Sequence, residues 1–118
     1  MPLTILLRCR DLEDTRRFYQ SALGFDVRDA DGGTLVAEHH GGALIFTSDD
    51  LWDGPPGFSG TLYFTVPDAE SYFAVVKHKV AVAWPLQEMS YGSREFGIKD
   101  CNGYFLAFQQ QEIGRAHV

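Results

Sequence analysis

The chain has 118 residues, of which 45% are hydrophobic and 22% are charged, and its formal net charge is −6. This composition fits a globular protein of one domain, or of two half-size units that share a core; it excludes a membrane-spanning chain and disfavours nucleic-acid binding, which needs a positive face. With only Cys9 and Cys101 as thiols and no signal-peptide core after Met1, the sequence predicts a cytoplasmic protein without a disulfide scaffold.

The first part of the chain predicts one helix among four strands. A β-prone run, Thr4–Arg10, is followed by Asp11, a residue type that caps helix N-termini. An amphipathic helix is predicted over Leu12–Leu23, and Gly24 ends it. Glycine-rich turns then separate three strands, predicted at Phe25–Asp29, Thr34–His39 and Ala43–Thr47.

The second part of the chain repeats this order after a predicted linker. The linker, Ser48–Ser59, is rich in aspartate, glycine and proline, and it also carries Trp52 and Phe58. The elements predicted after it are a strand at Thr61–Val66, a helix at Ala69–Lys79, and strands at Val80–Trp84 (ended by Pro85), Ser93–Lys99 and Tyr104–Gln109.

An internal repeat organises the chain. Aligning Asp11 with Asp68 places Thr4 on Thr61, so that each unit begins with a strand and continues with a helix and three strands. The predicted fold is α+β, with two tandem βαβββ units that form a curved eight-stranded mixed sheet around a concave cavity. The predicted boundaries are 1–50 for the first unit, 51–59 for the linker, 60–112 for the second unit and 113–118 for a tail.

Two motifs resemble the vicinal oxygen chelate superfamily, which includes glyoxalase I, extradiol dioxygenases, and fosfomycin- and bleomycin-resistance proteins. The first is Arg10–Tyr19 with Leu23-Gly24-Phe25 after it. The second, Tyr91–Phe96 with Asp100–Phe108 after it, is similar to segments of the bleomycin-resistance-like branch. The resemblance covers about residues 3–110. It implies a homodimer, swapped or side by side, with a pocket in the concave sheet or at the dimer boundary.

The resemblance also implies where a metal would be held in the metal-dependent branches. A ligand, often histidine, opens the first strand of each unit, and these positions are Thr4 and Thr61 in this sequence. A carboxylate is expected in the last strand of a unit, yet Ala43–Phe46 contains none and Ala107 stands where a glutamate would be. Threonine hydroxyls are poor ligands for divalent ions. We therefore expect neither a metal nor another cofactor.

Aromatic and charged residues supply the candidate ligand contacts. Aromatic rings stack on planar ligands, although they also fill cores. Arg94 and Glu95 are adjacent in a strand, so only one can face the cavity and the other needs an ion-pair partner. The predicted ligand-binding residues are Thr4, Phe46, Trp52, Phe58, Thr61, Tyr63, Trp84, Tyr91, Arg94, Glu95, Phe96 and Tyr104.

These features together favour a metal-free protein that binds an antibiotic-like aromatic or cationic small molecule and carries no catalytic residues. One alternative is a metal-dependent lyase, isomerase or dioxygenase of the same superfamily, which would need ligands that the sequence does not show. A second alternative is a dimerisation or regulatory module that binds no small molecule.

Overall fold

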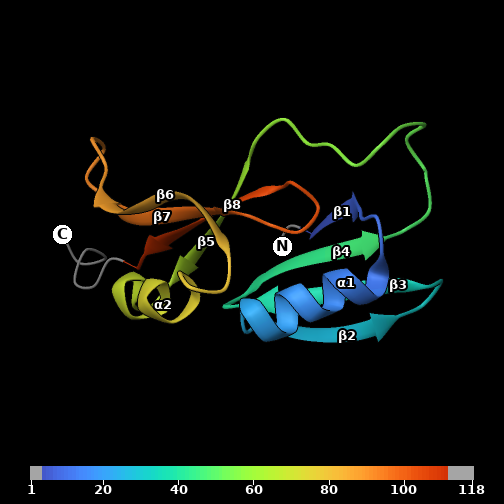
Figure 1. The fold of residues 1–118 in the computed structure, drawn as a ribbon, viewed down its shortest axis with the longest axis horizontal. Coiled ribbons are helices and arrows are strands. Elements are labelled where there is room, and N and C mark those ends of the chain that lie inside the picture. Colours follow the sequence, from blue (N-terminus) through green and yellow to red (C-terminus); the bar gives the residue numbers. More distant parts are fainter. Residues whose placement is uncertain (1–3, 112–118) are drawn as a thin grey trace.

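The computed structural model describes residues 4–111 and contains two βαβββ units joined by a linker (Figure 1). The predicted α+β fold is thereby confirmed, whereas residue 112 and the predicted tail, 113–118, lie outside the described residues. No helix in residues 4–111 is long and apolar enough to cross a membrane. The first unit consists of β1 (Thr4–Arg8), α1 (Leu12–Arg17), the π-helical segment η1 (Phe18–Ala22), β2 (Asp26–Ala30), β3 (Thr34–His39) and β4 (Gly42–Thr47). The second consists of β5 (Thr61–Val66), α2 (Ala69–Val76), β6 (Ala81–Glu88), β7 (Arg94–Lys99) and β8 (Phe105–Gln110).

The eight strands form two four-stranded sheets rather than one continuous hydrogen-bonded sheet. The strand order is β1-β4-β3-β2 in the first sheet and β5-β8-β7-β6 in the second. In each sheet the first strand of the unit lies parallel to the last, and the other pairs are antiparallel. The repeat inferred from sequence therefore appears as two sheets with the same topology.

Both helices begin as the sequence predicts. The Asp11 carboxylate accepts a hydrogen bond from the Asp14 amide at 2.9 Å, and Asp68 accepts one from the Ser71 amide at 3.1 Å. Each aspartate thus satisfies one of the amides that a helix leaves unpaired in its first turn. The predicted second helix was too long, since α2 ends at Val76, the last buried residue of its apolar stripe.

The end predicted for the strand after α2 is wrong. This strand, β6, does not end before Pro85 but continues to Glu88. The register against β7 shifts on both sides of Trp84. A proline is tolerated there because β6 is an edge strand, where a missing N–H breaks no bond to an outer neighbour.

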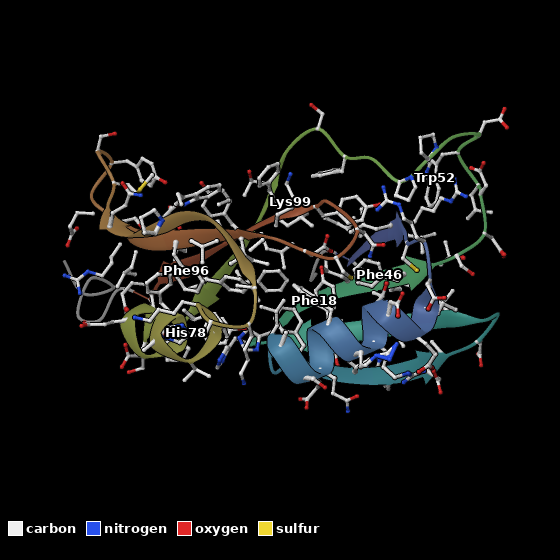
Figure 2. The ribbon with its side chains drawn as sticks, in the orientation of Figure 1. Phe18, Phe46, Trp52, His78, Phe96 and Lys99 are labelled. Atoms are coloured by element: carbon white, nitrogen blue, oxygen red, sulfur yellow. The ribbon has the colours of Figure 1, made fainter. Side chains whose placement is uncertain are left out.

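One apolar core spans both units (Figure 2). The Phe25 ring of the first unit packs edge to face on Phe64 of the second, with centroids 5.2 Å apart. The Tyr72 hydroxyl donates a hydrogen bond to the Leu23 carbonyl at 2.5 Å, again across the boundary. Phe46 and Phe96 are completely buried in this core. The two units therefore support one another and hold the sheets in a fixed relation.

The imidazole of His39 lies at this boundary and predicts acid sensitivity. It stacks on Phe25 at 4.5 Å, and its Nε2 is buried without a hydrogen-bond partner. Burial, with a smaller contribution from the neighbouring His40, lowers the pKa of His39 to about 4, while Asp26 opposes the shift. Because the unfolded chain binds the proton more readily, the stabilisation is complete above pH 6.5 and is lost as the pH falls towards 4.

We expect acidification from pH 7 to pH 4 to lower the free energy of unfolding more in the wild type than in His39→Phe, which keeps a stacked ring. The difference should be about 1–2 kcal/mol, less than the full shift implies because the ring is only partly buried. Urea unfolding at both pH values measures it. Identical pH dependence in the two proteins would contradict the assignment to His39.

Candidate functional site

The second sheet has one face covered by α2 and one face free of helices. The Phe96 ring packs on Tyr72 and Phe73 of α2, with centroids 5.9 and 4.9 Å apart. Since side chains alternate along a strand, Glu95 and Gly97 of β7 face the other way. Strand register extends this helix-free face, which comprises Thr61, Tyr63, Trp84, Glu95, Gly97, Lys99, Phe105 and Ala107.

The centre of the helix-free face is the carboxylate of Glu95, which is completely buried. Oε2 accepts hydrogen bonds from the Trp84 Nε1–H at 3.2 Å and from the Tyr63 hydroxyl at 3.4 Å. Oε1 accepts a short hydrogen bond from the Tyr91 hydroxyl. These four residues, called the Glu95 cluster below, were all among the predicted contacts. The sequence therefore identified residues that the fold brings together from β5, β6, β7 and the β6–β7 turn.

Trp84 reaches Glu95 because residue 97 has no side chain. A Cβ atom on Gly97 would lie 2.3 Å from Cε2 of the Trp84 ring. The indole thus lies directly over the strand and aims its N–H at the carboxylate. The indole also stacks with the Phe105 ring; the two centroids are 6.4 Å apart and the ring planes are tilted by 23°. An aromatic layer therefore covers this part of the sheet.

Charge is distributed unequally between the two faces. Arg94 lies on the face towards α2, where it forms ion pairs with Glu70 and Glu88 at 3.4 Å each. Glu95 forms no ion pair with any described basic residue. The prediction that Arg94 and Glu95 point to opposite faces is borne out by these contacts. Chiefly through the hydrogen bond to Glu95, the pKa of Tyr91 is raised, so this hydroxyl keeps its proton at neutral pH.

Three other predicted residues line a cavity of about 300 Å³ beside β1. Trp52 and Phe58 of the linker form one side, and Tyr104 and Leu6 form part of the other. The Arg8 guanidinium fixes the linker through an ion pair with Asp50 at 3.4 Å. Trp52 and Phe58 thus pack over the first strand instead of joining the Glu95 cluster.

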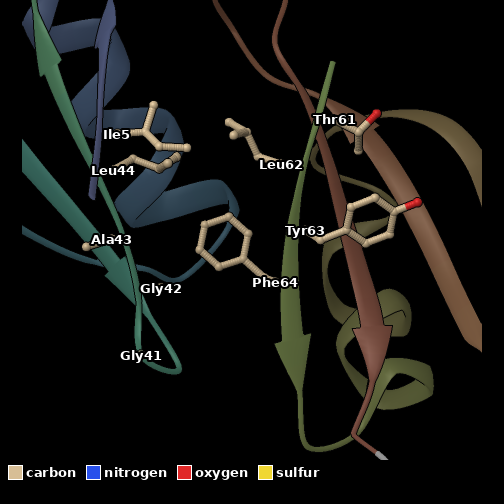
Figure 3. Close-up of a pocket in the computed structure, with 9 residues that line it drawn as sticks. All are labelled: Ile5, Gly41, Gly42, Ala43, Leu44, Thr61, Leu62, Tyr63 and Phe64. Atoms are coloured by element: carbon tan, nitrogen blue, oxygen red, sulfur yellow. The ribbon is translucent and has the colours of Figure 1, made fainter. Parts of the chain in front are cut away.

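A further cavity of about 430 Å³ lies between the units, bounded by β1, β4 and β5 (Figure 3). Leu62 and Phe64 point from β5 towards Ile5 and Leu44, whereas Tyr63 points away from them. Its lining is mainly apolar and includes no charged side chain. Such a cavity offers volume but few groups that could orient a ligand.

The remaining predicted contacts lie apart from the Glu95 cluster. Phe46 and Phe96 are in the core and have no exposed surface in this conformation. Thr4 is exposed at the start of the first sheet, and Thr61 is half-buried on β5. The sequence missed Gly97, Lys99 and Phe105, although their spacing from Glu95 and across the Asn102-Gly103 turn places them on the same face.

The residues do not fit the metal site of the metal-dependent relatives. Within residues 4–111, no group of three or more histidine, cysteine, aspartate or glutamate side chains is arranged to hold a metal ion. Ala107 is completely buried and pairs in register with Tyr63 and Gly97, so nothing in this row offers an oxygen or nitrogen ligand apart from a phenol. Among residues 4–111, Glu95 supplies the only carboxylate on the helix-free face.

Comparison with known proteins identifies a matching family model and several solved structures of similar fold. A family model described as the glyoxalase/bleomycin resistance protein/dioxygenase superfamily matches residues 3–108. No curated protein matches significantly. Similar solved structures include a member of this superfamily from Sphaerobacter thermophilus, with a TM-score of 0.77, 15% identity and coverage of 94% of this chain and 97% of that one.

Two further structures have the same fold. One is a glyoxalase/bleomycin resistance protein/dioxygenase from Alicyclobacillus acidocaldarius, with a TM-score of 0.76, 17% identity and coverage of 100% of this chain and 96% of that chain. The other is TioX from Micromonospora sp. ML1, with a TM-score of 0.75, 14% identity and coverage of 95% and 97%. At these identities the likeness concerns the fold.

Proposed function

Because the chain belongs to the glyoxalase/bleomycin resistance protein/dioxygenase superfamily, we propose that it binds a small molecule on the helix-free face of the second sheet without a metal. The observation that carries this proposal is the Glu95 cluster. A buried carboxylate without an ionic partner is costly, and three aromatic donors hold it on a face that no helix covers. Such a concentration of aromatic surface and fixed polar groups is typical of ligand sites.

The proposed ligand is an antibiotic-like molecule with an aromatic or cationic part, bound and sequestered without reaction. Tyr63 and Tyr91 are 51% and 60% exposed, which leaves both rings free to stack on a planar group. We do not favour the alternative of a metal-dependent lyase, isomerase or dioxygenase, because residues 4–111 contain no group of three or more histidine, cysteine, aspartate or glutamate side chains arranged to hold a metal ion. We also propose a cytoplasmic location, because both cysteines are free thiols.

We further propose that two chains form a homodimer that encloses the ligand. Leu6 is 41% exposed on β1 and Tyr63 is 51% exposed on β5, and both stand on sheet faces without a covering helix. A second copy laid across these faces would bury them and convert an open surface into a cleft. Sedimentation velocity should give a dimer, and a monomer at all concentrations with and without ligand would contradict this part of the proposal.

Ligand binding is tested by thermal unfolding in the presence of planar aromatic and cationic compounds. A compound at 100 times its dissociation constant should stabilise the wild type by about 2.7 kcal/mol. Tyr63→Ala should abolish the shift, because it removes an exposed ring of the Glu95 cluster. Val75→Ala, which trims a side chain that is 60% exposed on α2, should retain it. The absence of any shift or calorimetric heat across the panel would contradict the proposal.

A further inference from the structure

We infer that the Glu95 cluster selects an organic cation, meaning an ammonium or guanidinium group, over neutral and anionic ligands of the same shape. This inference rests on the proposed function, and it adds the chemical class of the group that the site takes. Three features support it: the polar hydrogens of the cluster already bond to Glu95, the Glu95 carboxylate has no ion-pair partner among the described residues, and Lys99 lies beside the aromatic layer.

The hydrogen-bond donors of the Glu95 cluster are all occupied. A tyrosine hydroxyl and a tryptophan indole each have a single polar hydrogen. Tyr63, Trp84 and Tyr91 all direct theirs to Glu95. The tyrosine oxygens can therefore present only lone pairs to a ligand, and the indole presents only its ring face. A surface of acceptors and ring faces is complementary to a ligand that donates hydrogens or carries positive charge.

The charge of Glu95 also favours a cation. Glu95 is completely buried and forms no ion pair with the basic residues of the described part of the chain. Solvent screens a buried charge less than an exposed one, so its field acts on a group bound above the tyrosines. An anion at that point would be repelled by Glu95 and would meet no free donor from the cluster. The net charge of −6 for the whole chain acts in the same direction.

The chain itself places a cation on this aromatic layer. The Lys99 Nζ lies 5.4 Å from the centroid of the Phe105 ring, and Phe105 stacks with Trp84. The aromatic layer next to Glu95 thus already holds an ammonium group at its edge. Because Lys99 is exposed, a ligand cation would compete with it and be repelled by it. Lys77 holds the same relation to Phe73 on α2, at 5.6 Å, and provides a matched control.

The test uses benzyltrimethylammonium, benzyl alcohol and benzoate, which share a phenyl ring and differ in charge. Isothermal titration calorimetry on the intact wild-type protein should show the cation binding about tenfold more tightly than the alcohol, a difference between those of an exposed and a buried cation–π contact. Benzoate should bind most weakly. Glu95→Gln should remove most of this preference, whereas Glu70→Gln, which makes the same charge change on the opposite face, should preserve it.

A second pair of variants keeps the inference testable if Glu95→Gln fails to fold. Lys99→Met should tighten binding of benzyltrimethylammonium about threefold, because it removes the competing and repelling ammonium. Lys77→Met should leave that binding unchanged. Equal affinity for the three compounds in the wild type, or an unchanged preference in a folded Glu95→Gln protein, would overturn the inference while leaving ligand binding intact. Failure of all three compounds and of the wider panel would overturn the proposed function and this inference together.

Discussion

Replacing Asp100 with alanine is expected to lower the free energy of unfolding by about 3–5 kcal/mol, because it leaves buried donors unpaired. One carboxylate oxygen of Asp100 accepts hydrogen bonds from the Asn102 and Tyr104 amides, both at 2.8 Å. The other accepts the Tyr19 hydroxyl at 2.5 Å. Tyr19 is completely buried in the first unit, so Asp100 connects the turn after β7 with the core of the other unit.

This loss is large on the scale of a whole domain, whose total stability is about 5–15 kcal/mol. Urea unfolding followed by circular dichroism measures it, with Asp31→Ala as the control, since Asp31 is exposed in the turn between β2 and β3. Asp100→Asn should lie between the wild type and Asp100→Ala, because an amide retains one acceptor oxygen. If Asp100→Ala and Asp31→Ala had the same free energy of unfolding, the three donors would have found other hydrogen-bond partners.

Much of the fold could be predicted because local rules agree with it. The capping aspartates fixed the alignment of Asp11 with Asp68, and this alignment placed Thr4 and Thr61 at the starts of β1 and β5. Alternation along β7 separated Glu95 from Arg94. These patterns depend on residues close in sequence, where periodicity and capping act directly.

The site could be predicted only in part because it depends on contacts between distant residues. Phe46, Phe96 and Trp84 are all aromatic residues in strands, yet the first two fill the core and the third lies on the helix-free face. Sequence alternation assigns a residue to a face but does not reveal which face a helix covers. The Tyr104 hydroxyl donates to the Arg8 carbonyl, a pairing across 96 residues that no local pattern indicates.

Pro85 in β6 shows again that a local sequence pattern does not reveal the tertiary surroundings of a residue. Pro85 is a reasonable signal for the end of a strand, because it removes a backbone donor. On an edge strand this donor is not needed, and β6 continues with shifts in register around Trp84. Those shifts bring the indole over Gly97 and next to Glu95. The predicted strand Val80–Trp84 contains Trp84, but nothing in its sequence indicates the register shifts that pair this residue with Gly97.

Gly97→Ala is therefore expected to disrupt the Glu95 cluster more than its size suggests. The added Cβ would approach the Trp84 ring to 2.3 Å, far inside van der Waals contact, so the indole must move off the strand. Its hydrogen bond to Glu95, now 3.2 Å, would be lost with it. Overpacking of this kind costs about 1–3 kcal/mol of stability. We expect binding of benzyltrimethylammonium to weaken about tenfold, in line with the loss of one ring face from the site.

Gly57→Ala is the matched control, because the nearest atom to a Cβ at that position is 3.9 Å away. It should change neither stability nor binding. Combining Gly97→Ala with Trp84→Ala then separates the effect of the clash with the indole from any effect of the substitution on the backbone of β7. With Trp84 replaced by alanine, Gly97→Ala should cost little further stability, since the clash has gone, yet binding should stay weak. If Gly97→Ala alone bound the cation as well as the wild type, Trp84 would not form part of the site, and the Glu95 cluster would have to recognise its ligand through the two tyrosines.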